Sequence, residues 1–319
     1  MDTLDVKILR ELLQSQATSP VNPDFRRSSR SIARKLGVAE DTVRNRVRMF
    51  RETHFLEDWH ISLNPNLFVA YEFLVFFDVP LAAKHDLIEQ ISLMPGAFLV
   101  SDLVGTELGV VLRCDSEREL DKQLALIRKL AKVENLYSAR IPYPECRIIL
   151  SRTDWAILKA LRESPRKSQS AVAKEVGLST RTVKRRLQRM IQERAVFAIG
   201  LLRPRALRGS VMAALLVIYP LDRKVNIDRK VNAELDRYIW HITHTLPRHP
   251  GDGCPCIYNL MLPNVSEANE ILSWAEHLPG VQSARIDFYE DMIFVFDSLD
   301  ESLTKKLGPT PFAREQPAK

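Results

Sequence analysis

The chain has 319 residues, and because one domain averages roughly 150 residues we expect two or more domains. Hydrophobic residues make up 45% and charged residues 27%, which excludes wholesale disorder and a collagen-like repeat, while a net charge of +6 permits a polyanionic partner. No run approaches 18 apolar residues, the N-terminus has no apolar signal region, and four cysteines are too few for a disulfide framework. The sequence therefore predicts a cytosolic protein without a membrane span.

An internal repeat divides the chain into alternating A and B units. Residues 4–12 return as 153–161 at an offset of 149, and residues 31–47 return as 171–187 at an offset of 140. The first copy therefore carries nine extra residues, which lie between positions 14 and 30. A repeat of this length predicts the order A-B-A-B.

The A units have the apolar spacing of three short helices. In the second copy Val183 and Leu187 repeat at helical spacing, Gly177 lies where a helix end favours a left-handed residue, and Ser179 can cap the next helix. This pattern predicts a helix-turn-helix, and residues 195–199 read as a strand that would form its wing.

The B units alternate strand and helix patterns. The second copy spans Val211 to Phe288, with a further strand candidate at Met292 to Phe296, and the tetrapeptide 138–141 recurs as 283–286. The order βαββαβ is the ferredoxin-like arrangement. In the first copy the expected strands are 71–79, 98–103, 109–113 and 136–141, and the expected helices are 84–94 and 117–131.

The predicted fold is α+β, with two winged helix-turn-helix domains alternating with two ferredoxin-like βαββαβ domains. The proline-rich tail without periodicity is expected to be disordered. The expected domains are 1–66 and 150–208 for the winged helices, 67–149 and 209–298 for the ferredoxin-like domains, and 299–319 for the tail.

Basic residues concentrate in the second A unit. From Leu150 to Ser210 there are fifteen Lys and Arg against four Asp and Glu, a net charge of +11. Because the major groove admits one helix, with its N-terminal residues at the base edges, we expect Thr180, Arg181 and Lys184 to face bases. The alternative is a solvated helix face. The DNA-binding candidates are Ser179, Thr180, Arg181, Thr182 and Lys184, with Arg185, Arg186 and Arg189 at phosphates.

The equivalent helix of the first copy starts with two acids, Glu40 and Asp41, which suit a helix N-terminus but would repel phosphates. Basic residues follow in the sequence from Arg44 onward. We expect DNA contact here too, with a packing or dimer-forming module as the alternative. The candidates are Thr42, Arg44, Arg46 and Arg48.

The A units resemble the Lrp/AsnC family of bacterial and archaeal transcription regulators. The resemblance implies a DNA-binding winged helix followed by a βαββαβ effector and oligomerisation domain, and double-stranded DNA as the partner. Because the module occurs twice, the chain resembles a covalent pseudo-dimer, and a larger homo-oligomer stays open. The matching residues are Leu4-Asp5, Ile8-Leu9, Leu12, Ile32-Ala33, Gly37, Thr42-Val43 and Arg46-Val47, and in the second copy Asp154, Ile157-Leu158, Leu161, Val172-Ala173, Gly177-Leu178-Ser179, Thr182-Val183 and Arg186-Leu187.

The family's effector loop, a glycine followed shortly by an acid between the second and third strands, is matched by Gly105 and Glu107 in the first copy. The resemblance implies these two as the residues that bind a small-molecule effector. In the second copy the insertion Thr245 to Cys256 replaces the loop. Since no hydrolase motif, phosphate-binding glycine loop or paired-carboxylate site is visible, we expect no cofactor and no enzymatic activity.

The insertion itself carries candidate metal ligands. His241 and the candidates His244, His249, Cys254 and Cys256 lie within sixteen residues, and imidazole and thiolate are ligands of zinc. Cys-Pro-Cys is not the usual two-residue spacing, however, and the prolines and glycines are typical of an irregular loop. The alternative is a buried histidine on a strand and free thiols.

A second function uses the same architecture. Siroheme decarboxylases resemble such regulators and also occur as fused pairs, and His244, His249 and residues 258–260 are similar to that enzyme's histidine and aromatic positions. Such an enzyme does not need the strongly basic helix at 179–189, so the charge favours the regulator.

Overall fold

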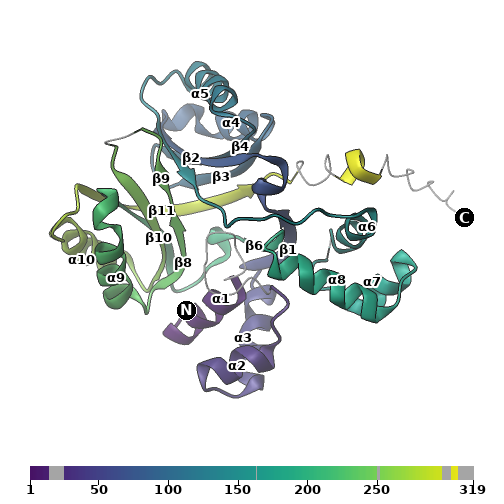
Figure 1. The fold of residues 1–319 in the computed structure, drawn as a ribbon. Helices are drawn as coiled ribbons and strands as arrows, with labels where there is room; N and C mark the ends of the chain where they lie inside the picture. The colour runs from purple at the N-terminus through teal and green to yellow at the C-terminus, as the bar shows by residue number, and fades with distance from the viewer. Residues whose placement is uncertain (14–24, 163, 250–251, 297–302, 308–319) are drawn as a thin grey trace, which may run out of the picture.

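The computed structural model describes residues 1–13, 25–162, 164–249, 252–296 and 303–307 (Figure 1). The fold is α+β, and it confirms two winged helix-turn-helix domains alternating with two ferredoxin-like domains. In this part of the chain every helix is too short or too polar to cross a lipid bilayer.

Each winged domain begins with three helices. The caps of the second domain are those expected, because the Ser179 hydroxyl accepts a hydrogen bond from the Thr182 amide at 3.1 Å and Gly177 has a φ of 67°. The first domain contains α1 (Thr3–Leu13), α2 (Ser29–Leu36) and α3 (Glu40–Glu52), and the second contains α6 (Arg152–Leu161), α7 (Gln169–Val176) and α8 (Thr180–Gln192).

A two-stranded linking ribbon joins the two winged domains. Strand β1 (Leu56–Leu63) of the first pairs antiparallel with β6 (Val196–Leu202) of the second. The strand expected as a wing of the second domain is therefore paired across the two copies. Both of its faces are apolar, which suits a strand that is buried on each side: Val196 packs with the winged helices and Ile199 with the inner face of the large sheet.

The two βαββαβ domains form one nine-stranded sheet in the order β8-β10-β7-β11-β3-β4-β2-β5-β9. Helices α4 and α5 cover the outside of one half and α9 and α10 the outside of the other (Figure 1). The first domain contains β2 (Tyr71–Asp78), α4 (Leu81–Ser92), β3 (Ala97–Leu103), β4 (Glu107–Cys114), α5 (Glu117–Ala131) and β5 (Tyr137–Ile141). The second contains β7 (Val211–Tyr219), α9 (Lys224–Leu235), β8 (Ile239–His244), β9 (Leu246–Pro247), β10 (Cys254–Leu262), α10 (Val265–Glu276) and β11 (Ser283–Phe294). Among the described residues, short 3-10 turns lie between strands or before a helix: η1 (Pro65–Phe68), η2 (Pro204–Ala206) and η3 (Leu221–Arg223).

Strand β11 holds the two halves of the sheet together. Residues 283–288 pair with β7, residues 289–294 pair with β3, and an irregularity between Tyr289 and Asp291 marks the change of partner. The separate strand expected at 292–296 is therefore wrong: positions 292–294 continue β11, because a second edge, that of β3, is available beyond β7.

The sheet curls toward closure around a central core. Strand β9 follows β8 in the chain after one residue, yet it pairs with β5 at the opposite end of the strand order. The inner faces of the two halves thus meet in one apolar cluster. Its buried members include Leu74, Phe76, Val111, Leu216 and Ile257, and Ile199 of the linking ribbon.

Part of the expected disordered tail is helical. Residues 303–307 form a helix, and Leu303, 6% exposed, packs into the core of the winged domains. Leu307, which is partly buried, packs against the same core, and burial of these two apolar side chains favours this placement of the segment. The rest of 299–319, and residues 14–24, where most of the nine extra residues of the first copy fall, lie outside the described residues.

Candidate functional site

The outer face of α8 carries the exposed cations. Arg181, Lys184 and Arg185 are exposed, while Val183 and Leu187 of the same helix are buried against the winged-domain core. In the described part of the chain none of these three cations has an acidic partner within 4.0 Å. The sequence-based selection of Thr180, Arg181 and Lys184 therefore falls on an accessible face.

Arg186, which is half-buried, and Arg189, which is exposed, both form ion pairs within the second winged domain. Their guanidinium groups lie 3.0 Å and 3.1 Å from the carboxylate of Asp154, which is fully buried at the start of α6. Burial raises the pKa of Asp154, but hydrogen bonds from Ser151 and Arg186 outweigh it and hold the pKa below the usual value. Both arginines thus tie α8 to α6, and their phosphate contacts stay a prediction.

In the first winged domain the candidate cations of α3 have acidic partners. Thr42 is half-buried, and each arginine is paired within its own domain. These pairs reduce the free positive charge of α3, so α8 is the stronger candidate surface. The pairs are Arg44 with Glu40 (2.8 Å) and Asp41 (2.8 Å), Arg46 with Asp2 (2.9 Å) and Asp5 (3.0 Å), and Arg48 with Glu52 (3.7 Å).

Gly105 and Glu107 lie where the two βαββαβ domains meet. The Gly105 carbonyl accepts a hydrogen bond from the Lys84 ammonium at 2.7 Å, and the Glu107 side chain accepts one from the Arg285 guanidinium of β11. Burial and the neighbouring Asp287 carboxylate raise the pKa of Glu107 to about 8, against the opposite effect of Arg285. The protein's own side chains therefore engage both residues, and their effector role stays a prediction.

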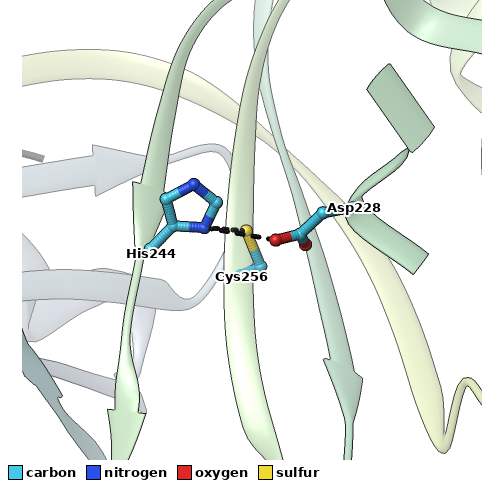
Figure 2. A group of neighbouring side chains, drawn as sticks. All are labelled: Asp228, His244 and Cys256. Carbon is cyan, nitrogen blue, oxygen red and sulfur yellow. Dashed lines mark hydrogen bonds and ion pairs between the residues drawn. The ribbon is translucent and has the colours of Figure 1, made fainter. Parts of the chain in front are cut away.

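Two of the four metal candidates come together beneath α9 (Figure 2). The Cys256 thiol lies 3.4 Å from Nδ1 of His244, and the Asp228 carboxylate lies 3.7 Å from the same nitrogen. The other two candidates lie elsewhere: the Cys254 thiol donates to the Thr245 carbonyl at 2.9 Å, and His249 is exposed. Sequence reasoning missed Asp228, because it is on a helix far from the His and Cys segment.

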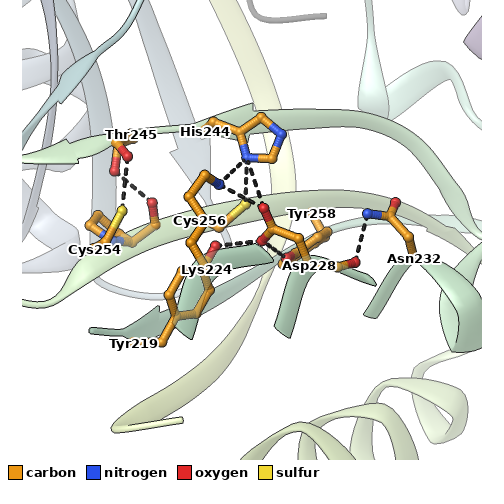
Figure 3. Close-up of polar contacts among 10 residues, drawn as sticks. Tyr219, Lys224, Asp228, Asn232, His244, Thr245, Cys254, Cys256 and Tyr258 are labelled. Atoms are coloured by element: carbon orange, nitrogen blue, oxygen red, sulfur yellow. Dashed lines mark hydrogen bonds and ion pairs between the residues drawn. The ribbon is translucent and has the colours of Figure 1, made fainter. Parts of the chain in front are cut away.

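A lysine already supplies the positive charge of this cluster (Figure 3). The Lys224 ammonium lies 2.7 Å from the Asp228 carboxylate and 2.7 Å from Nδ1 of His244. Tyr219 and Tyr258 each donate to the same carboxylate at 2.6 Å. Burial raises the pKa of the Cys256 thiol to about 12 and lowers the pKa of His244, so both are neutral near pH 7. The arrangement is an ion-pair network with both charges satisfied.

A central cavity lies between the linking ribbon and the inner face of the sheet. Its volume is about 130 Å³, and it is lined mostly by apolar and aromatic side chains. Its polar groups include Trp240, His241 and Asn259, and the Tyr289 hydroxyl donates to the Asn259 side-chain oxygen at 2.6 Å. This cavity could not be predicted from local sequence patterns, because its walls come from both copies of the repeat.

Comparison with known proteins first defines the class of the second A unit. Residues 150–194 match a family described as winged helix-turn-helix DNA-binding. Over 65 residues the chain is 42% identical to the HTH-type transcriptional regulator Ptr1 of Methanocaldococcus jannaschii. This alignment covers 20% of the chain and 38% of the regulator, so the match spans less than two fifths of the regulator's length.

Solved structures with this fold include an enzyme. The siroheme decarboxylase NirDL matches with a TM-score of 0.57 and 12% identity, over 95% of this chain and 98% of NirDL. AsnC of E. coli matches with a TM-score of 0.31 and 16% identity, over 47% of this chain and 97% of AsnC.

The full-length match corrects the expectation that the chain has no enzymatic activity. That expectation rested on missing catalytic motifs, whereas the fold shared over 95% of the chain is that of a siroheme decarboxylase. One fold can serve unrelated functions, so the absence of familiar catalytic motifs does not exclude enzymatic activity for this chain.

Proposed function

We propose that this protein binds double-stranded DNA through α8 and regulates transcription. The observation that carries the proposal is the row of exposed cations Arg181, Lys184 and Arg185 on a helix that lies within the matched winged helix-turn-helix region. Cations without acidic partners are free to displace counterions from phosphates, and one helix fits the major groove. Similarity to the regulator Ptr1 supports the same function.

We further propose a regulator of the Lrp/AsnC type in which one chain carries both halves of a dimer. The pairing of β1 with β6 and of β3 with β11 supports this arrangement, because each pair joins one copy of the repeat to the other. The domain boundaries expected from the sequence, at 66, 149, 208 and 298, remain part of this proposal. Such a chain presents two winged domains to DNA, with α8 as the main contact and α3 as the weaker one.

The test removes three charges from α8. The variant Arg181→Ala, Lys184→Ala, Arg185→Ala is compared with Arg118→Ala, Lys122→Ala, Lys129→Ala, which removes three exposed cations from α5. Affinity is measured by fluorescence anisotropy on a duplex selected from random sequences, over a range of salt concentrations. We expect the α8 variant to bind at least tenfold more weakly, and its salt slope to fall by about 0.9 per lost phosphate contact. Equal affinity of the two variants would contradict the proposal.

A second candidate function is decarboxylation of a haem precursor, favoured by the full-length fold match with siroheme decarboxylase. Two observations rank it lower. The central cavity has no Lys or Arg among its described lining residues, although siroheme is a polycarboxylate. In addition, His244 lies in the Asp228 network while His249 is exposed at the surface. Titration with iron-uroporphyrin III tests it: a shifted Soret band together with CO₂ release would assign the enzyme.

A further inference from the structure

The two winged domains exchange arginine side chains where they meet. Arg26 of the first domain donates hydrogen bonds to the carbonyls of Pro165 and Lys167 in the second, at 2.8 Å and 2.5 Å. Arg166 of the second domain donates to the carbonyl of Arg27 in the first, at 2.5 Å. A guanidinium group carries several N–H donors in one plane, so one side chain can bind two carbonyls at a fixed angle. We call the two arginines and these three carbonyls the arginine clasp.

The arginine clasp is symmetric. Arg26 and Arg166 differ by the repeat offset of 140, and each lies two residues before a serine, Ser28 or Ser168, that caps the next helix. Both arginines are half-buried. The same position of the repeat therefore makes the same kind of contact from each side, as residues do in a dimer with a two-fold axis. Because every bond of the clasp joins one copy to the other, the clasp serves the pairing of the two winged domains.

The clasp is a second connection between these domains. The linking ribbon joins them after the third helix of each, since β1 follows α3 and β6 follows α8, whereas the clasp joins them at the start of α2 and α7. A two-stranded ribbon can adopt a larger twist than a wide sheet, and the apolar core that the domains share is not directional. Arg166 also lies 5.5 Å from the ring centre of Trp59 in β1, which connects the clasp to the ribbon. Directed hydrogen bonds at this second place therefore fix the angle between α3 and α8.

We propose that Arg26 and Arg166 are positioning residues: they set the angle and separation of α3 and α8, and through them the spacing between two DNA segments that the protein contacts. The inference rests on the proposed function, in which both winged domains face DNA. Each base pair turns the duplex by about 34°, so two helices held at one angle match one spacing. Loss of the clasp should widen the range of spacings that the protein binds.

The first experiment measures the separation of α3 and α8 without DNA. Spin labels are attached at Arg48→Cys and Gln188→Cys, which are exposed positions of α3 and α8 related by the repeat offset. The background carries Cys146→Ser, because Cys146 is half-buried while the other three cysteines are buried. Double electron–electron resonance then gives the distribution of distances between the two labels in the full-length chain.

Three double variants are compared in this background. Arg26→Ala with Arg166→Ala removes the clasp, and we expect the distance distribution to widen about twofold or more. Arg26→Lys with Arg166→Lys keeps the charge but not the planar donors, so it should widen the distribution as well, and it serves as the test if circular dichroism shows that the alanine variant does not fold. Arg34→Ala with Lys174→Ala is the control, because it removes two exposed cations at equivalent positions of α2 and α7 and should leave the width unchanged.

The second experiment measures spacing on a duplex selected from random sequences. Hydroxyl-radical footprinting locates the protected segments, and two base pairs are then inserted between them, which turns one segment by about 70°. We expect wild type and the Arg34, Lys174 control to lose at least tenfold in affinity on insertion, and the clasp variants to lose less than threefold.

The outcomes separate this inference from the proposed function. Equal distance distributions in the clasp variants and the control, a single protected segment, or equal losses on insertion in wild type and the clasp variants would each overturn the spacing role of Arg26 and Arg166 while DNA binding stands. Failure of wild type to bind any duplex would overturn the proposed function, and the spacing role with it.

Discussion

The guanidinium of Arg186 lies 3.0 Å from the fully buried carboxylate of Asp154, directly beneath the proposed DNA-binding face of α8. The first winged domain contains the same contact, between Arg46 and Asp5 at 3.0 Å. Both copies of the repeat therefore use a helix-to-helix ion pair to fix the angle between the first and third helices. The arginine that looks like a phosphate ligand in the sequence thus has a structural partner.

We predict that Asp154→Ala lowers the free energy of unfolding by about 2–4 kcal/mol. The variant loses the carboxylate that accepts from the backbone amide of the N-cap residue Ser151, and it leaves Arg186 without its buried partner. Urea denaturation measures the effect. Asp41→Ala is the control, since that carboxylate is 80% exposed in its pair with Arg44 and should contribute less than about 1 kcal/mol. Equal losses in the two variants would show that burial of Asp154 does not matter.

The pH dependence gives this prediction a second readout. The pKa of Asp154 is below its unfolded value of 3.8, so its stabilising contribution is present above about pH 4 and disappears as the pH falls further. The difference in stability between wild type and Asp154→Ala should therefore shrink on acidification. A difference that stays constant down to pH 2 would contradict the lowered pKa.

Glu107 should give the free energy of unfolding the opposite pH dependence. Its pKa is raised to about 8, and the folded protein therefore holds a proton that the unfolded chain releases near pH 4.5. Stability should be greatest below about pH 4.5 with respect to this group and fall as the pH rises toward 8. We predict that Glu107→Gln flattens this part of the stability profile, measured by urea denaturation between pH 5 and 8. A profile that keeps its slope would show that Asp287, or another group, carries the proton.

Short-range sequence patterns predicted the winged domains and most of the sheet strands. The Ser179 cap and the left-handed Gly177 depend on neighbours a few residues away, so they could be predicted from local spacing. The linking ribbon could not, because Ile61 and Ala198 are partners separated by more than a hundred residues. Both faces of β6 are apolar because the strand lies between the winged-domain core and the inner face of the large sheet, and this position depends on both copies of the repeat.

The candidate sites, too, could be predicted only where they depend on residues close together in the sequence. The exposed cations of α8 could be predicted, because helical periodicity alone separates them from the buried face of the helix. The partner of Arg186 lies on another helix, and Lys224 and Asp228 approach His244 only because α9 packs on the sheet. The Lys-Asp spacing of four residues at 224 and 228 was the available signal, since it puts both side chains on one helix face.

We predict that Lys224→Met lets Asp228, His244 and Cys256 hold a divalent metal ion that the Lys224 ammonium of wild type excludes. In wild type the ammonium neutralises Asp228 and contacts His244, so a divalent cation would have to displace it. In the variant the carboxylate, the imidazole and the Cys256 thiol are left to a metal, and a bound metal favours the thiolate. Titration with Co²⁺ should give a thiolate-to-cobalt absorbance band in Lys224→Met only. The double variant with Cys256→Ser should lack the band, and a band in wild type would contradict the role of Lys224.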